Sequence, residues 1–257
     1  MHSLVEYDVI YLDTIRGKDI RYGIITFKNP KHFWNSTVHE WGTRIEEHRF
    51  NPLVLSELSS IFDRIEAEIT TLAGSVITGE GKYFCNGIDV SYIQKHPENA
   101  NSVQKGVEKL MARILSLGLV TVALINGHAA GAGAIISLCC DYRVMNDRGL
   151  FVLPAVELGI VYSQGFIEVV KSKVHDERLR RDMLLLSKKY TSVDLQRCGL
   201  VDIVVSEQSS LDESLRIIHE NFQKNHHSYS LVKQRLYKKA ISCLMDERVS
   251  DMHWSRI

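Results

Sequence analysis

The sequence has few prolines and no excess of either charge, and both shortages narrow the kind of protein it encodes. Only 4 of its 257 residues are proline, and 31 basic residues balance 31 acidic ones. The balance argues against nucleic acid as the default partner, because phosphate binding depends on a surplus of Lys and Arg on one face. With 45% hydrophobic and 24% charged residues, the composition is that of a globular domain and not of a disordered or coiled-coil chain.

Long apolar runs and a cysteine framework are also missing. No run reaches the roughly 18–20 residues that a bilayer-spanning helix needs, and residues 1–7 lack the basic start and apolar stretch of a signal peptide. We therefore expect an intracellular protein without a membrane span. Five cysteines are an odd number, and no CxxC pair occurs. This pattern predicts reduced thiols and neither disulfides nor a metal site.

Apolar periodicity predicts strands and helices that alternate along the chain. Asn51 before Pro52 is a typical cap for the first helix, and Gly118 is expected to end the second. Residues 29–47 have no clear period and are expected to form a loop. The alternation is typical of an α/β domain whose sheets are covered by helices. The predicted strands are 7–12, 22–27, 75–78, 120–125 and 201–205, and the predicted helices are 51–69, 103–117 and 134–140.

The last part of the sequence is predicted to be helical. Residues 211–222 and 231–245 are amphipathic at helical spacing, and no strand is predicted after them. We interpret them as a separate C-terminal region. This places a core at residues 1–205 and a helical region at 206–257, with the boundary near Ser206.

Two glycine-rich segments follow buried strands, at residues 79–89 and 127–133. Small residues there allow a backbone to approach a ligand closely. A helix that begins at Ala132 and Gly133 would direct unpaired N–H groups at a developing negative charge, which is how an oxyanion hole is built from backbone. Either segment alone is weak support, because glycine turns after strands are common in α/β folds.

Together, and in this order, the segments resemble the crotonase (enoyl-CoA hydratase/isomerase) superfamily. Thr78–Asp89 matches the family pattern of strand, Gly, Lys, Phe, small residue, Gly, x, Asp. Asn126–Arg143 matches Asn-Gly-His-Ala-x-Gly-x-Gly, a helix and Cys-Asp-Tyr-Arg. The resemblance covers roughly residues 7–205 and implies a ββα spiral fold with a C-terminal helical trimerisation region. The motifs most similar to the plant-like peroxisomal Δ3,Δ2-enoyl-CoA isomerases are His48-Arg49-Phe50, Cys85-Asn86-Gly87 and Asp147-Arg148-Gly149.

The resemblance implies an acyl-CoA or enoyl-CoA thioester as ligand, with coenzyme A as part of the substrate and no separate cofactor. By motif position, the backbone N–H groups of Ile88 and Ala132 would hold the thioester carbonyl. The adjacent C2 proton then becomes acidic, and an isomerase needs one carboxylate to move it to C4. The residues implied to contact substrate are Cys85, Asn86, Gly87, Asp89, Gly131 and Gly133.

The sequence departs from the family at the catalytic carboxylate. The usual Glu of this family falls at Ala155. The second Glu of a hydratase would fall at Ile135, which argues against two-carboxylate hydration but is compatible with an isomerase. Glu157 is a candidate base, although a capping or ion-paired surface carboxylate is the more common role. Glu168 is a more distant candidate.

Three explanations for Ala155 stay open. The base could come from elsewhere in a Δ3,Δ2-enoyl-CoA isomerase of fatty-acid β-oxidation. Alternatively, the chain could be an acyl-CoA-binding homologue with little or no turnover, or a designed Glu→Ala variant. Hydrolase or dehalogenase chemistry would need nucleophiles that the sequence does not offer.

The final residues, Ser255-Arg256-Ile257, resemble the Ser-Lys-Leu peroxisomal address, which an import receptor reads. The sequence therefore predicts a peroxisomal location, or otherwise a cytoplasmic one. By resemblance, the expected assembly is a homotrimer or a hexamer.

Overall fold

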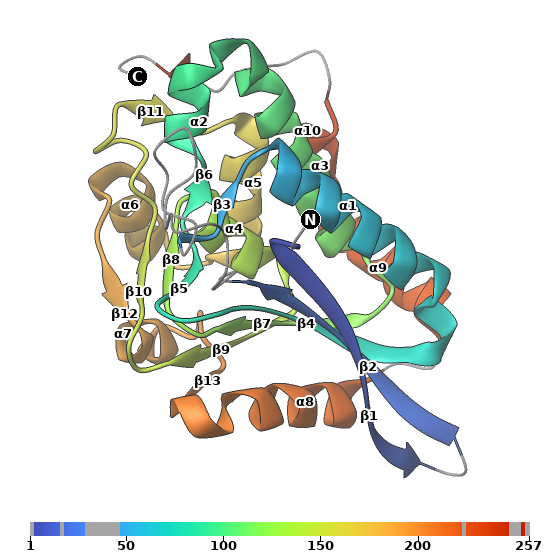
Figure 1. Cartoon of the computed structure of the whole chain (residues 1–257). Helices are drawn as coiled ribbons and strands as arrows, with labels where there is room; N and C mark the ends of the chain where they lie inside the picture. Colours follow the sequence, from blue (N-terminus) through green and yellow to red (C-terminus); the bar gives the residue numbers. More distant parts are fainter. Residues whose placement is uncertain (1–2, 16–17, 29–46, 223–224, 247–252, 255–257) are drawn as a thin grey trace, which may run out of the picture.

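The larger sheet of the structure has six strands (Figure 1), in the order β1-β2-β4-β7-β9-β13. The computed structural model describes every residue except 1–2, 16–17, 29–46, 223–224, 247–252 and 255–257. The expected loop at 29–47, apart from its last residue, and the Ser255–Ile257 tail lie outside the described residues. The strands of this sheet are β1 (Val5–Ile15), β2 (Lys18–Phe27), β4 (Leu72–Gly79), β7 (Val120–Ile125), β9 (Tyr142–Asn146) and β13 (Ile203–Val205).

The chain steps repeatedly from this sheet to a second one. β5 (Tyr83–Cys85), β8 (His128–Ala130), β10 (Leu150–Val152) and β12 (Tyr190–Thr191) form a sheet in the order β12-β10-β8-β5. β4 leads to β5, β7 to β8 and β9 to β10, and a helix follows the first two pairs before the chain returns. This repeat of two strands and a helix is a ββα spiral, so the predicted fold class is confirmed. β8 lies within the segment that the sequence predicted as a turn.

The helices close around the two sheets. The Asn51 side chain caps α1 by accepting from the amides of Leu53 and Val54 at 3.1 Å each, as the sequence predicted. Among the described residues, no helix is both long and apolar enough to cross a membrane. The helices before the C-terminal region are α1 (Pro52–Ala67), α2 (Val90–Lys95), α3 (Ala100–Ser116), α4 (Ala132–Cys139), α5 (Gln164–Lys173), α6 (Glu177–Leu186) and α7 (Ser192–Arg197).

The C-terminal region differs from its prediction in two respects. The helix expected at 231–245 is divided at Tyr237 into α9 (His226–Leu236) and α10 (Lys238–Leu244). A strand follows them: β14 (His253–Trp254) pairs antiparallel with β11 (Ile160–Val161). α8 (Ser210–Asn221) packs against β4, β7 and β9 and covers one face of the large sheet. The division of the chain at Ser206 stays a prediction.

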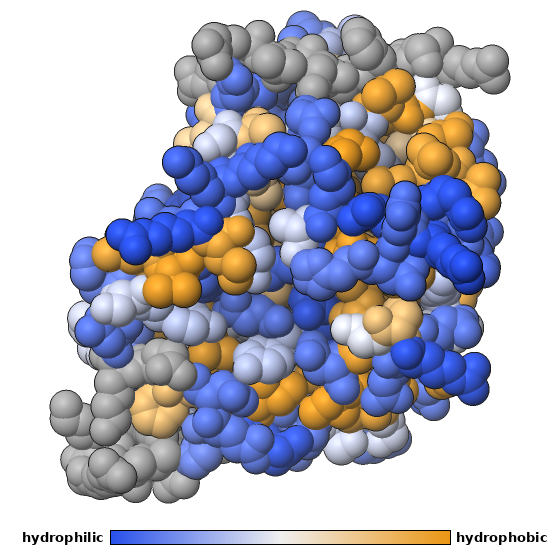
Figure 2. All heavy atoms as spheres, turned by 180° about the vertical axis from the view of Figure 1, so that it is seen from behind, coloured by the Kyte–Doolittle hydropathy of each residue, from blue (hydrophilic) through white to orange (hydrophobic). Residues whose placement is uncertain are grey.

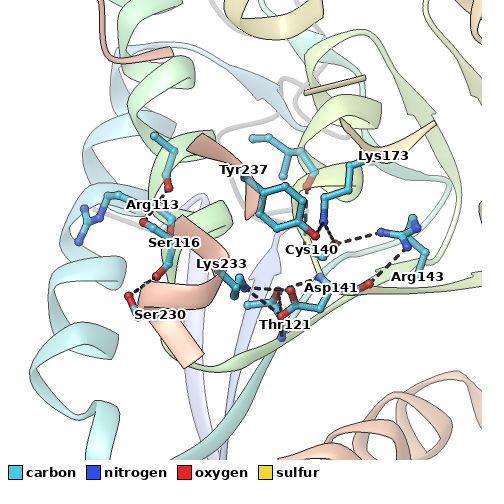
Figure 3. A network of polar contacts seen from close by, with 12 residues as sticks. Arg113, Ser116, Thr121, Cys140, Asp141, Arg143, Lys173, Ser230, Lys233 and Tyr237 are labelled. Carbon is cyan, nitrogen blue, oxygen red and sulfur yellow. Dashed lines mark hydrogen bonds and ion pairs between the residues drawn. The ribbon is translucent and has the colours of Figure 1, made fainter. Parts of the chain in front are cut away.

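A buried ion pair attaches α9 to the core (Figure 3). Lys233 Nζ lies 2.9 Å from the carboxylate of Asp141, and the two side chains are only 5% and 12% exposed. The amide and the hydroxyl of Thr121 in β7 each donate to the same carboxylate at 2.9 Å. Nearby, Lys173 of α5 donates to the Cys140 carbonyl at 3.2 Å and to the Tyr237 hydroxyl at 2.9 Å. The polar network thus joins the end of α4 to α5, β7 and the C-terminal helices.

We expect Lys233→Met to lower the free energy of unfolding by roughly 3 kcal/mol, because it leaves a buried carboxylate without its cation. Urea denaturation measures the change. Arg216→Met is the control, because its ion pairs with Glu213 and Glu220 lie on the exposed side of α8 and surface pairs contribute little. Equal losses in the two variants would contradict the role of the Asp141 pair.

Candidate active site

A pocket opens to solvent where the two glycine segments meet the chain after β10. Its wall contains both residues predicted to hold a carbonyl, Ile88 and Ala132, together with Ala155. The sequence-predicted residues Asn86 and Gly131 also line it. The structure therefore brings the main predicted positions into one site. The remaining lining residues are Arg49, Val90, Pro154, Leu158, Ile160, Tyr162 and Phe166.

Contacts with residues 47–50 hold the first glycine segment in place. Ile88 belongs to β6 (Gly87–Ile88), which pairs in parallel with β3 (Arg49–Phe50). The Arg49 guanidinium donates to the Asn86 carbonyl at 3.3 Å and pairs with Glu47 at 2.8 Å. The Cys85 thiol donates to the His48 carbonyl at 2.8 Å. Burial raises the pKa of Cys85 to about 12, so this thiol is neutral and structural and is not a nucleophile.

The second glycine segment turns directly into α4. Gly131 has φ of +53° and precedes Ala132, the first residue of the helix. The amide of Gly131 donates to the Val152 carbonyl at 3.0 Å. The first amides of a helix have no partner within the helix, so the Ala132 N–H is free of the α4 ladder and stands at the positive end of the helix.

Glycines allow the two segments to touch. A Cβ at Gly87, which has φ of +79°, would lie 2.8 Å from the Ala132 nitrogen. A Cβ at Gly133 would overlap the Cys85 carbonyl. The backbones of β6 and α4 are therefore packed directly against each other, and this contact sets the separation of the Ile88 and Ala132 amides.

Ala155 lies in the pocket wall, at the start of a turn that also contains Glu157. Its side chain is 3% exposed, and its carbonyl accepts from the Ile160 amide at 2.8 Å to close the turn. Glu157, two residues later, is exposed and is not among the described residues that line the pocket. Glu168 is buried, but it pairs with Lys171 at 2.8 Å and with Lys239 at 3.2 Å and does not line the pocket either.

Two other residues of the glycine segments have structural roles. Asp89 is buried, and its carboxylate accepts from the Tyr92 amide at 3.1 Å as the cap of α2. His128 Nδ1 accepts from the Leu150 amide at 3.2 Å, and its ring packs against Tyr83. Burial, with a contribution from Lys82, lowers the pKa of His128. Both residues support the glycine segments and do not line the pocket.

Tyr162 is the pocket residue that sequence reasoning missed as a possible functional group. It lines the same wall as Ala155, and its hydroxyl is buried without a hydrogen-bond partner among the described residues. Burial raises the pKa of Tyr162, against a smaller lowering by the nearby Ala155 amide. With its pKa raised, the hydroxyl stays protonated at neutral pH.

The sequence is similar to a known family of proteins and to several of its members. The family profile described as Enoyl-CoA hydratase/isomerase matches residues 46–253. Enoyl-CoA delta isomerase 3 of Arabidopsis thaliana is 30% identical over 205 residues, which cover 75% of this chain and 84% of the relative. Enoyl-CoA delta isomerase 2, peroxisomal, of the same plant is 32% identical over 180 residues, covering 66% and 75%.

Solved structures share the fold. Human mitochondrial delta3-delta2-enoyl-CoA isomerase superposes with a TM-score of 0.76 at 24% identity, covering 94% of this chain and 87% of that one. The fold and the site define a crotonase-type protein. The chain belongs to the enoyl-CoA hydratase/isomerase family, as its sequence motifs predicted.

We expect Gly87→Ala to destabilise the protein more than Gly199→Ala does. Both glycines have a similar positive φ, +79° and +71°, but a Cβ at Gly199 meets nothing within 4 Å. Both variants pay backbone strain of about 1–2 kcal/mol, and only Gly87→Ala also pushes α4 away, at an added cost of about 1–3 kcal/mol. Urea denaturation of the two variants checks this, and equal losses would contradict the close contact.

Proposed function

We propose that this protein is an enoyl-CoA isomerase-type protein that binds acyl-CoA and enoyl-CoA thioesters. The observation that carries the proposal is the meeting of the Ile88 and Ala132 segments at one pocket whose wall includes Ala155. In this proposal the two amides donate to the thioester carbonyl. Coenzyme A is part of the substrate, and no further cofactor is required.

The reaction that an enoyl-CoA isomerase-type protein would catalyse is the shift of a 3-enoyl-CoA double bond to the 2-position. As the C2 proton leaves, negative charge develops on the carbonyl oxygen. Donors fixed in advance stabilise this charge, and each is worth roughly 10²–10³ in rate where one has been removed from other enzymes. The names of the Arabidopsis relatives, enoyl-CoA delta isomerases, support this reaction.

Proton transfer is the step that this chain supports poorly. The wall position of the usual carboxylate is Ala155, and Glu157 is exposed outside the lining. We therefore propose that thioester binding and carbonyl polarisation are retained, while isomerisation is slow or absent. This favours the acyl-CoA-binding alternative over a displaced base at Glu157.

Assembly and location are further parts of the proposal. Large apolar side chains remain exposed on the single chain, among them Leu185 at 61% and Leu186 at 65%, and Figure 2 shows apolar patches between hydrophilic residues on one face. Such patches often mark interaction surfaces. We propose a homotrimer or hexamer, located in peroxisomes through import-receptor recognition of Ser255-Arg256-Ile257. The name of one Arabidopsis relative, which is described as peroxisomal, supports that location.

We expect Ala155→Glu to raise the isomerisation rate of 3-hexenoyl-CoA by about 10²–10⁴, the contribution of a positioned general base. A spectrophotometric assay of 2-enoyl-CoA formation measures it, with butyryl-CoA binding measured in parallel. Ala155→Gln is the matched control, because it has the same shape without a basic carboxylate. Absence of butyryl-CoA binding by the unaltered protein would contradict the proposal itself.

We expect Glu157→Gln to leave both thioester affinity and the residual isomerisation rate within about twofold, because surface substitutions away from a site have small effects. The same assay on the unaltered protein and the variant tests this. If the unaltered protein turns over well and Glu157→Gln abolishes turnover, the base is Glu157, and slow proton transfer is the wrong description.

A further inference from the structure

The guanidinium of Arg49 binds the carbonyls on both sides of Gly87. Its Nη1 donates to the Asn86 carbonyl at 3.3 Å and to the Ile88 carbonyl at 3.5 Å. Its Nε donates to the Glu47 carboxylate at 2.8 Å, and the two side chains of this ion pair are only 26% and 18% exposed. A guanidinium is planar and presents its donors in a fixed arrangement. One side chain therefore bridges two carbonyls of the first glycine segment, while a carboxylate fixes its own orientation.

The peptide group that carries the Ile88 N–H lies between the two peptide groups whose carbonyls the guanidinium binds. The first of these neighbours also donates its N–H, that of Gly87, to the Cys85 sulfur at 3.4 Å. The second donates its N–H, that of Asp89, to the Phe50 carbonyl at 2.9 Å. Each neighbour is thus bound at its N–H and at its carbonyl, and the guanidinium supplies the bond to both carbonyls.

This segment needs such support because its central residue is a glycine. Gly87 has φ of +79°, and glycine adopts positive and negative φ about equally well, so its own preference does not fix the chain direction. The register of β6 with β3 contains only two residue pairs. The close contact with α4 sets the distance of the segment from Ala132, but it does not set the direction in which the Ile88 N–H points.

We propose that Arg49 is a positioning residue that directs the Ile88 N–H toward the thioester carbonyl. This inference rests on the proposed function, in which Ile88 and Ala132 donate to that carbonyl. Arg49 is among the residues of the pocket lining, but the proposed role acts through the backbone of β6 and requires no contact with the ligand. The Ala132 N–H needs no comparable support, because it belongs to the first turn of α4. One donor is held by a helix and the other by a side chain.

The test measures how strongly the two amides polarise the thioester carbonyl. Butyryl-CoA labelled with a heavy carbon isotope at this carbonyl is bound at saturation, and infrared difference spectra give the carbonyl stretching frequency independently of turnover and of affinity. We expect binding to the unaltered protein to lower this frequency. Because two donors act on one oxygen, Arg49→Met should remove roughly half of the shift. Glu47→Ala should reduce the shift as well, since it keeps the cation but removes the carboxylate that orients it.

Arg21→Met is the matched control. The Arg21 side chain is similarly exposed, at 25%, and pairs with Glu68 at 3.1 Å, but it is not among the described residues that line the pocket. We expect this variant to keep the full shift. An equal reduction in Arg21→Met would show that loss of any half-buried arginine loosens the site, and it would overturn the specific role of Arg49.

The outcomes separate this inference from the proposed function. If butyryl-CoA does not bind the unaltered protein, or binds without a shift, the proposed function fails and this inference fails with it. If the shift is present and survives in Arg49→Met, only this inference is overturned. A full shift in Glu47→Ala also overturns it, because the charge of Arg49 would then act without a fixed orientation. This second variant leaves Arg49 in place, so it decides the question even if Arg49→Met does not fold.

Discussion

The direct backbone contact between β6 and the start of α4 is the constraint on which the site depends. A Cβ at Gly87 would meet the Ala132 nitrogen, and a Cβ at Gly133 would meet the carbonyl of Cys85, the last residue of β5, which lies just before β6. Gly127, directly before β8, makes a similarly close approach to the Lys82 carbonyl. Since Ile88 and Ala132 are adjacent to these contacts, the positions of their amides are set by backbone packing and not by adjustable side chains. A preorganised pair of donors is what carbonyl polarisation requires.

α4 connects this site to the C-terminal helices. Its first residue, Ala132, is at the pocket, and its other end leads into Cys140 and Asp141, which lie in the polar network of Figure 3. Lys233 of α9 and Lys173 of α5 bind this second end. The helix is therefore anchored at both ends, on one side by glycine packing and on the other by buried charge. This explains physically how a region late in the sequence contributes to the rigidity of a site built from earlier segments.

The features that could be predicted from the sequence are those encoded by short local patterns. The glycine segments, the Asn51 cap and the ββα alternation are of this kind, and they located Ile88, Ala132 and Ala155 in one pocket. The break at Tyr237 and the pairing of β14 with β11 could not be predicted, because short strands and helix breaks depend on packing partners distant in sequence. Tyr162 gave no signal for the same reason. A tyrosine after a short strand looks like core, and only the folded structure shows that its hydroxyl lacks a partner beside the pocket.

The chemistry that the pocket can support depends on the residue at position 155. With Ala155 in place of a carboxylate, the described lining of the pocket contains no acidic side chain. A lining without a carboxylate has no strong side-chain base that could accept a carbon-bound proton. Binding and polarisation of a thioester need only donors, whereas isomerisation needs an acceptor as well. In the proposed function, Ala155 therefore limits proton transfer, while the backbone of β6 and α4, which would hold the carbonyl, is unaffected.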